Sequence, residues 1–321
     1  MAAPRIAVVL GAGGTVGHAF HAGVLAALHH ELGWDAGRAD LIVGTSAGSI
    51  VAALLRAGLP AADLAHRARR EPLSPAGAAV IATAQLSLPE RPPPRQPGRG
   101  QISSPARLAR AVRAPWQVRA GSLAAAVLPV GKVPTAQIAA PLDALYGDSW
   151  PAQPMWIVAV ELDSGRRVVF GREGAPIATA AEAVRASCAI PAYFEPPLID
   201  GSRYVDGGVH STTNADLVAD EVPDLVVVSA PMAGARGAVA RFGPGVAMRQ
   251  IARLSLSREV AGLREREIPV VAFQPTAADL AVMGTDSLDP DRLAPVCAQV
   301  FETTCHRLAR SDVRERLAAL V

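Results

Sequence analysis

Ser46 stands in the pattern with the most chemical content in this 321-residue chain, a G-x-S-x-G turn that reads G-T-S-A-G from Gly44 to Gly48. An apolar segment precedes the turn and an Ala/Leu-rich segment follows it, which predicts a strand, a sharp turn and a helix. A serine at such a turn is strained and exposed, and the flanking glycines relieve the crowding. The helix N-terminus also favours negative charge that develops beside it. We therefore predict that Ser46 is a nucleophile.

Asp206 is the candidate for the group that activates this serine. A serine hydroxyl is a poor nucleophile until a base takes its proton. None of the seven histidines stands in a context that marks it as the usual base. Asp206 ends a predicted strand, and Gly207 and Gly208 let the backbone turn sharply at a sheet edge. D-G-G is also a common turn sequence, and His210 is an alternative base. The residues alone leave a direct acid and a histidine open.

A glycine-rich loop, residues 11–17, follows the first predicted strand and precedes a predicted helix. Closely spaced glycines such as Gly13 and Gly14 allow backbone N–H groups to converge on an anion. In acyl transfer that anion is the oxygen of the tetrahedral intermediate. The alternative is the nucleotide-cofactor turn of an oxidoreductase, but G-x-G-x-x-G starting at Gly11 would require glycine where Val16 stands. We favour an oxyanion loop over a cofactor loop.

The elements that must position these residues alternate between strands and helices. Apolar runs predict strands at 6–10, 41–43, 156–162, 167–170, 198–199, 203–205, 225–229 and 269–273. Helical composition predicts helices at 18–32, 46–57, 177–187, 246–266 and 291–320. The opening order of strand, turn and helix is typical of a parallel sheet, whereas Asp163-Ser164-Gly165 and Asp200-Gly201 predict hairpins. We expect an α/β fold, a three-layer sandwich around a central, mostly parallel sheet.

The middle of the chain interrupts this alternation. The stretch 88–100, LPERPPPRQPGRG, disfavours regular structure. Residues 102–133 carry several arginines and Trp116 among apolar side chains. We interpret about 85–135 as a Pro/Arg-rich lid or insertion that could touch lipid, although an ordinary packed surface helix is equally consistent. With a helical C-terminal part from about 246, the expected organisation is a single domain over 1–321.

Composition excludes several classes of protein. Half of the residues are hydrophobic, which rules out a disordered or fibrous chain. With 31 Lys and Arg against 29 Asp and Glu, and 4% aromatic residues, we expect no nucleic-acid binding.

The three cysteines have no zinc-ligand pattern, so we expect a reducing compartment and no metal site. Since no uninterrupted apolar run reaches the roughly 18 residues of a spanning helix, we expect a cytoplasmic protein that could adhere to a membrane surface. The oligomeric state stays open.

Taken together, the motifs resemble those of the patatin-like phospholipase family. The glycine loop, G-T-S-A-G-S and D-G-G occur in the order found in that family. A-G-V-L at 22–25, R-A-S-C-A-I-P-A-Y-F at 185–194 and Asn214 are also similar to the family pattern. The resemblance runs in blocks from about Ile6 to Asp216, and the order of the blocks makes it specific.

This resemblance implies a Ser–Asp dyad in which Asp206 accepts the proton of Ser46 without a histidine. It also implies an acyl-enzyme on Ser46, an oxyanion hole made by the backbone amides of Gly13 and Gly14, and neither metal nor cofactor. The glycines that would support these turns are Gly11, Gly44, Gly48, Gly207 and Gly208. The implied substrates are phospholipids, neutral lipids and small esters.

The glycine loop departs from the family at Thr15 and Val16, where an Arg or Lys is usual, and the stretch 17–23 is one residue longer. Because the oxyanion donors would be backbone groups, this departure bears on substrate class more than on reaction type. An inactive lipid-binding member of the same fold is therefore a further alternative. His18 and His21 lie close to the loop, and one of them could line the pocket.

Overall fold

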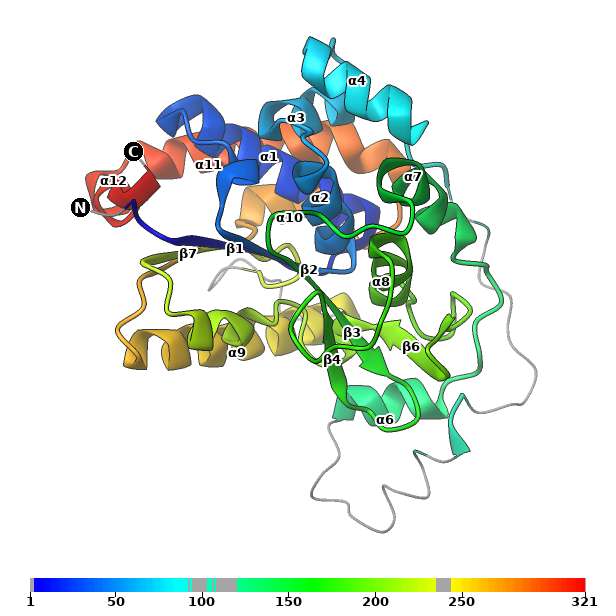
Figure 1. Cartoon of the computed structure of the whole chain (residues 1–321). Helices are drawn as coiled ribbons and strands as arrows, with labels where there is room; N and C mark the ends of the chain where they lie inside the picture. The colour runs from blue at the N-terminus through cyan, green and yellow to red at the C-terminus, as the bar shows by residue number, and fades with distance from the viewer. Residues whose placement is uncertain are drawn as a thin grey trace.

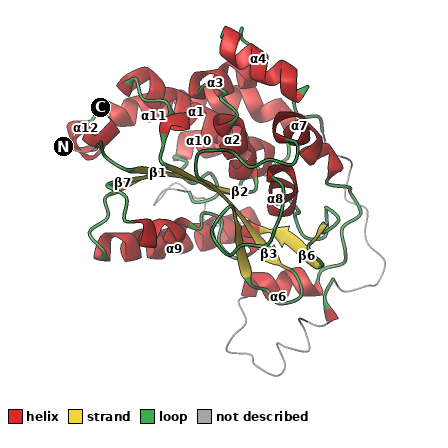
Figure 2. Ribbon diagram, viewed as in Figure 1, coloured by secondary structure: helices red, strands yellow, loops and turns green. Residues whose placement is uncertain are grey.

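The structure of the protein is a computed structural model that describes residues 3–91, 93, 103–105, 107, 120–234 and 244–320. Its strands are β1 (Ile6–Leu10), β2 (Leu41–Thr45), β3 (Met155–Glu161), β4 (Arg167–Phe170), β5 (Leu198–Ile199), β6 (Ser202–Asp206), β7 (Leu225–Ser229) and β8 (Val270–Phe273). Within the described residues these strands form one eight-stranded sheet (Figures 1 and 2). The strand order is β5-β6-β3-β2-β1-β7-β8, and β4 pairs with β3 outside that path.

The centre of the sheet is parallel, and one side of it is antiparallel. β1 lies between β2 and β7, and these pairs run parallel, as do β2 with β3 and β7 with β8. β4 and β6 both run antiparallel to β3, and β5 runs antiparallel to β6. Every residue of β1, β2 and β7 is buried, as expected of strands covered on both faces. The predicted mostly parallel sheet is confirmed.

Helices cover both faces of this sheet. They are α1 (Gly14–Leu32), α2 (Ala47–Arg56), α3 (Ala61–Arg69), α4 (Pro75–Ala84), α6 (Ala120–Val127), α7 (Ala136–Tyr146), α8 (Ala180–Ser187), α9 (Pro244–Glu265), α10 (Ala277–Met283), α11 (Leu293–Leu308) and α12 (Ser311–Arg316). Successive strand residues face opposite sides. Val8 and Ile42 share a core with α1, α2 and α11, whereas Val9 and Val43 share a second core with α9. Figure 1 shows α9 below the sheet and the other group above it, so the three-layer α/β prediction is confirmed.

Some element boundaries differ from the sequence-based expectation for local reasons. The helix predicted at 291–320 is divided into α11 and α12, because Arg310 between them is extended, with φ −76° and ψ 131°. The helix predicted at 177–187 begins only at Ala180, since Thr179 and Glu182 form a reciprocal capping box there. No helix is predicted for α3, α4, α7 or α10. The sequences of α3, α4 and α10 are short and rich in alanine, and Pro141 interrupts that of α7.

Both predicted hairpins are confirmed. Asp163-Ser164-Gly165 joins the antiparallel strands β3 and β4. Asp200 and Gly201 join β5 to β6 with φ of 47° and 74°, the left-handed values of a tight two-residue hairpin.

Other expectations concern the organisation of the chain. The interpretation of 85–135 as a lid or insertion concerns a segment of which part, including Trp116, lies outside the described residues, and both this interpretation and the single-domain organisation stay predictions. Among the helices that the structure describes, none combines the length and apolar character needed to cross a membrane.

Candidate active site

The register of the sheet brings Ser46 and Asp206 together. β2 runs parallel to β3 and ends with Thr45 opposite Val158. β6 runs antiparallel to β3 and ends with Asp206 opposite Ala159. The two strands therefore run toward each other along β3, and they end at neighbouring residues of it. Ser46 follows the end of the first strand, and Asp206 is the end of the second.

Ser46 occupies a strained turn between β2 and α2. Its backbone has φ 54° and ψ −121°, a conformation that costs energy in a residue with a side chain. The turn is possible because Gly48 lies against β1: a Cβ on Gly48 would be 2.0 Å from the carbonyl oxygen of Leu10. Gly44 is as closely confined, since its Cβ would lie 2.6 Å from the Cα of Ser49. These contacts explain why both flanking positions carry glycine.

Hydrogen bonds on two sides fix the backbone of this turn. The N–H of Ser46 donates to Ser187 Oγ at 2.8 Å, and that hydroxyl donates to the carbonyl oxygen of Val158 at 2.6 Å. Ser49 Oγ donates to the carbonyl oxygen of Ser46 at 2.6 Å. The Ser46 side chain is thus the part of the residue left to do chemistry, and the residue is 5% exposed.

The Asp206 carboxylate is buried and accepts a hydrogen bond from the N–H of Gly208 at 2.7 Å. Burial raises the pKa of Asp206 from 3.8 to about 6, and the interactions with the Ser46 side chain and the Gly208 N–H act in the opposite direction. Gly207 allows the turn, since a Cβ there would lie 2.4 Å from the carbonyl oxygen of Val158. At neutral pH the carboxylate is ionised and can accept a proton from the serine.

The glycine loop lies beside this pair. Gly13 precedes α1 and Gly14 begins it, with φ 62° at Gly14. A Cβ on Gly208 would be 3.4 Å from Cβ of Ala12, so the loop adjoins the turn after Asp206. The first N–H groups of a helix have no partner inside the helix, and such groups bind anions. The loop can therefore supply backbone donors, whereas the N–H of Val16 already donates to the carbonyl oxygen of Ser287 at 3.0 Å.

His21 supports the glycine loop from within the protein. Its Nε2 lies 2.8 Å from the carbonyl oxygen of Gly11, and its Nδ1 lies 2.8 Å from Ser229 Oγ. Because a carbonyl only accepts, Nε2 carries the hydrogen and Nδ1 accepts from the serine hydroxyl. Burial lowers the pKa of His21 to about 4. His21 is fully buried and His18 is 8% exposed, so His21 ties β1 to β7 rather than lining an open pocket.

His210, the alternative base, belongs to the turn after Asp206, where its N–H donates to the carbonyl oxygen of Gly207 at 3.0 Å. Arg167, and after it His210, acts to lower the pKa of Asp216. The side chain that acts on the pKa of Asp206 is that of Ser46, which supports the direct acid as the candidate base.

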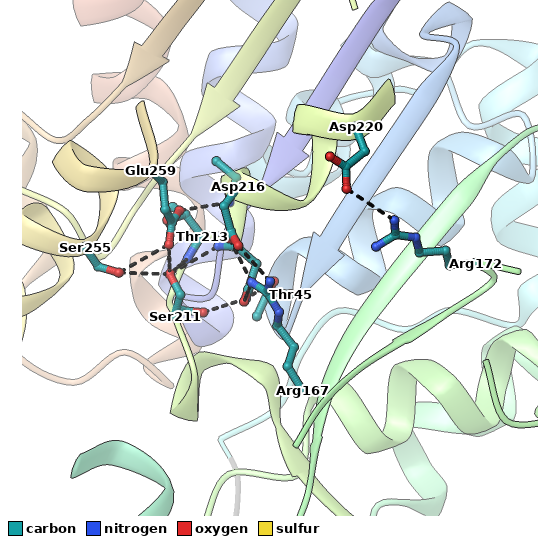
Figure 3. A network of polar contacts seen from close by, with 11 residues as sticks. Thr45, Arg167, Arg172, Ser211, Thr213, Asp216, Asp220, Ser255 and Glu259 are labelled. Atoms are coloured by element: carbon teal, nitrogen blue, oxygen red, sulfur yellow. Dashed lines mark hydrogen bonds and ion pairs between the residues drawn. The ribbon is translucent and has the colours of Figure 1, made fainter. Parts of the chain in front are cut away.

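A buried polar network holds the loop that follows Asp206 (Figure 3). Glu259 of α9 accepts hydrogen bonds from Thr213 Oγ1 at 2.7 Å, from the N–H of Ala215 at 2.8 Å and from the Ser211 hydroxyl. Burial raises the pKa of Glu259, and these three donors counteract that rise. The sequence gives no local signal for Glu259, which stands in an ordinary amphipathic helix.

Asn214 connects this network to β2, the strand that precedes Ser46. It has φ 56°, and its Nδ2 donates to Thr45 Oγ1 at 3.1 Å and to the carbonyl oxygen of Ser211 at 2.6 Å. Its Oδ1 accepts from Arg167 at 3.2 Å, and Arg167 also pairs with Asp216 through two hydrogen bonds of 2.7 Å. Because Thr45 directly precedes Ser46, the network couples the loop after Asp206 to the turn at Ser46. The sequence motif already singled out Asn214, but not its partners.

Two further features bear on what the site can hold. No group of three or more His, Cys, Asp or Glu side chains in the described ranges is arranged to hold a metal ion. A cavity of about 520 Å³ lies between β8, α9 and α11, and neither Ser46 nor Asp206 lines it. The candidate active site therefore lies outside that cavity.

The comparison with family models agrees with the motifs. The sequence model of the family described as patatin-like phospholipase matches residues 8–114 and 156–219. Among solved structures, VipD from Legionella pneumophila is similar, with 13% identity and a TM-score of 0.42 over 96% of this chain and 67% of VipD. The type III effector protein ExoU is similar, with 18% identity and a TM-score of 0.36 over 98% of this chain. The chain spans about half, 53%, of the length of ExoU.

Proposed function

This chain belongs to the patatin-like phospholipase family, and from that premise we propose that it is a serine hydrolase that cleaves lipid acyl esters. Ser46 is the proposed nucleophile, and Asp206 is the proposed general base. The N–H groups of Gly13 and Gly14 are the proposed oxyanion donors. The single observation that carries the proposal is the meeting of two buried residues, since β2 and β6 end on adjacent residues of β3 and so bring Ser46 and Asp206 together.

The proposed reaction has two half-reactions. Ser46 Oγ attacks the ester carbonyl carbon while its proton passes to the Asp206 carboxylate, and the loop amides stabilise the oxyanion. Collapse of this intermediate breaks the ester C–O bond, and the departing alkoxide takes the proton from Asp206. Water then attacks the acyl-enzyme and gives its proton to Asp206. The second collapse releases the carboxylic acid and returns the proton to Ser46, so no metal or redox cofactor takes part.

Burial gives Asp206 the properties that a direct base needs. A carboxylate with an ordinary pKa is a weak base, and proton transfer improves as the pKa of the base approaches the working pH. The raised pKa of about 6 therefore favours proton transfer while the group remains ionised at neutral pH. The strained φ of Ser46 also supports an active site over an inactive lipid-binding relative, because strain of this kind persists where it is used.

The nucleotide-cofactor alternative finds less support. A pyrophosphate at the loop would need the N–H groups at the start of α1. The N–H of Val16 is already bound to Ser287, and a Cβ on Gly14 would lie 2.6 Å from the same carbonyl oxygen. The segment around Ser287 therefore occupies space next to the loop.

We also propose that the chain acts as one hydrolase domain over 1–321, with about 85–135 as a lid or insertion beside the site. Thr15 and Val16 supply no cation in the glycine loop, so we expect the backbone amides to bind the oxyanion alone. This leaves neutral lipids and small esters as substrates beside phospholipids.

Acyl esters of graded chain length, tested beside phospholipid vesicles, provide the experiment for this proposal. The wild-type protein should release carboxylic acid from at least one class of ester, and Ser46→Ala should release none while remaining folded. Equal turnover by both proteins would refute Ser46 as the nucleophile. Tight NAD(P) binding in a thermal-shift titration, without ester turnover, would favour the oxidoreductase instead.

A further inference from the structure

α9 has two faces that differ in chemistry. Its inner face packs on the sheet through buried apolar side chains and carries Glu259 toward the aspartate loop. Its outer face presents Met248, Ile251 and Leu254, which are 52%, 61% and 46% exposed. Their spacing of three residues places them along one side of the helix. Single exposed apolar residues are common on protein surfaces. Three of them at three-residue spacing on one helix form a patch, and packing within this protein does not account for that patch.

The same half of the helix is positively charged. Residues 246–258 include Arg249, Arg253 and Arg258 and no acidic residue. Arg258 is exposed and lies seven positions after Ile251, which places it on the same side of the helix. Within the described part of the chain, neither Arg253 nor Arg258 forms a salt bridge, although Arg258 lines a pocket that Asp216 and Asp220 also line. The outer face therefore combines apolar side chains with arginines that are not held in salt bridges.

This face lies directly behind the proposed catalytic loops. Arg249 donates to the carbonyl oxygen of Pro231 at 2.9 Å, and Pro231 Cγ lies 2.8 Å from where a Cβ on Gly13 would stand. Six residues further along the helix, Ser255 Oγ lies 3.2 Å from the Oγ of Ser211, which belongs to the loop after Asp206. In the view of Figure 1, α9 lies below the sheet, and no labelled helix lies on the side of α9 that faces away from the sheet. A surface that met this side of α9 would be separated from both loops only by the helix.

We propose that the outer face of α9, formed by Met248, Ile251, Leu254 and Arg258, docks on a lipid surface that carries anionic headgroups. A basic helix with an apolar side is typical of proteins that lie in the headgroup layer of a membrane. The apolar side chains enter the acyl boundary, and the arginines pair with the phosphates. A membrane supplies both in one plane and requires no matching shape. The role of this contact in substrate delivery rests on the proposed hydrolase function, whereas the binding itself does not.

Vesicle flotation with the Ser46→Ala protein tests this docking without any chemistry. We expect binding to phosphatidylcholine vesicles that contain phosphatidylglycerol, and weaker binding to phosphatidylcholine alone. The combined variant Met248→Ser, Ile251→Ser, Leu254→Ser should bind the anionic vesicles about tenfold or more weakly. The matched control replaces exposed apolar residues elsewhere, Ile177→Ser with Val222→Ser, and should bind like the parent. Equal binding by the α9 variant and the parent would overturn the proposal, and would leave a protein partner to explain the stripe.

A second arm tests the charge. Arg253→Gln with Arg258→Gln should weaken binding to the anionic vesicles about tenfold, and added salt should do the same to the parent protein. Binding that is insensitive to both changes would overturn the anionic part of the proposal.

Activity assays separate this inference from the proposed function. In the active background, the apolar α9 variant should hydrolyse a soluble short-chain ester at the parent rate and vesicle phospholipid much more slowly. If the parent hydrolysed no ester while Ser46→Ala still bound vesicles through α9, the hydrolase would be refuted and the docking surface would stand.

Discussion

His21 and Glu259 support the two halves of the proposed site from opposite faces of the sheet. His21, on α1, holds the end of the glycine loop through two hydrogen bonds, to Gly11 and Ser229. Glu259, on α9, holds the loop after Asp206 through three donors. Neither side chain is a proposed reacting group, and both fix backbone that the proposed chemistry requires.

The imidazole of His21 and the carboxylate of Glu259 differ in charge, and this difference explains why Glu259 has more hydrogen-bond donors around it. A neutral imidazole loses little on burial once each ring nitrogen has a partner, because it carries no net charge. A buried carboxylate must recover the solvation of a full charge, so it needs several donors. The lowered pKa of His21 keeps that ring neutral, whereas the raised pKa of Glu259 measures the desolvation that its donors offset only in part. We therefore expect the acidic support to be the more sensitive of the two.

The largest expected effect is that of Glu259→Ala. It would leave the Ser211 and Thr213 hydroxyls and the N–H of Ala215 without their acceptor, which should lower the free energy of unfolding by about 3 kcal/mol. Urea unfolding measures the loss, and ester turnover should fall with it because the aspartate loop loses its anchor. Glu259→Gln, which keeps one acceptor oxygen, should lose less. Glu265→Ala on the exposed side of the same helix is the control and should change neither quantity. A loss below about 0.5 kcal/mol for Glu259→Ala would break the comparison.

His21→Ala should have the next largest effect. The substitution leaves a cavity and removes the donor to Gly11 and the acceptor for Ser229, for a loss of about 2 kcal/mol in the free energy of unfolding. His306→Ala, at an exposed position on α11, is the matched control. If His21→Ala lost more stability than Glu259→Ala, our ranking of the two supports would be wrong.

The pH dependence of stability should separate the supports by sign. The pKa of His21 is lowered from 6.5 to about 4 in the folded protein, so between these values the unfolded chain binds a proton that the folded protein does not. Stability therefore falls as the pH is lowered through this window, and His21→Gln should remove part of that fall. The pKa of Glu259 is raised above 4.5, so its contribution is present below pH 4.5 and lost as the pH rises through the folded pKa. Glu259→Gln should therefore lack this additional stability at acidic pH.

Urea unfolding at several pH values from 4 to 7 tests both statements. Parallel curves for the wild type and His21→Gln would contradict the first. An acid gain that survives in Glu259→Gln would contradict the second.

Thr45→Val should have the smallest effect. It removes the hydroxyl that accepts from Asn214 Nδ2 and keeps the shape of the side chain, so a loss of about 1 kcal/mol is expected. Ester turnover should fall a fewfold if this hydrogen bond aligns the nucleophile turn with the aspartate loop. An unchanged turnover with the expected loss of stability would limit the network to a structural role.

The parts of this molecule that follow local rules were predictable from the sequence. The turns at Ser46 and Asp206 have local causes, glycines beside a strand end, so their motifs can be read directly. The parallel sheet follows from the continuous apolar runs of β1, β2 and β7. The register that ends β2 and β6 on adjacent residues of β3 is a long-range property, and only the family resemblance anticipated its result.

Other parts depend on contacts that no local pattern records. Glu259 meets hydroxyls of a loop far away in the sequence, and nothing around it distinguishes it from a solvated glutamate. His21 could be placed near the glycine loop, but not given its role, since both of its partners lie at strand ends brought together by folding. α4 escaped prediction because its alanines give no apolar periodicity.

Fluorophosphonate labelling of the wild-type protein across pH tests the central claim most directly, because it requires the Ser46 hydroxyl and its base together. We predict labelling on Ser46 at a rate that falls about tenfold per pH unit below about pH 6, the pKa of Asp206. Asp206→Asn should slow the labelling by orders of magnitude, and His210→Ala should leave it unchanged. Labelling that persists in Ser46→Ala, or that depends on His210 and not on Asp206, would contradict the account.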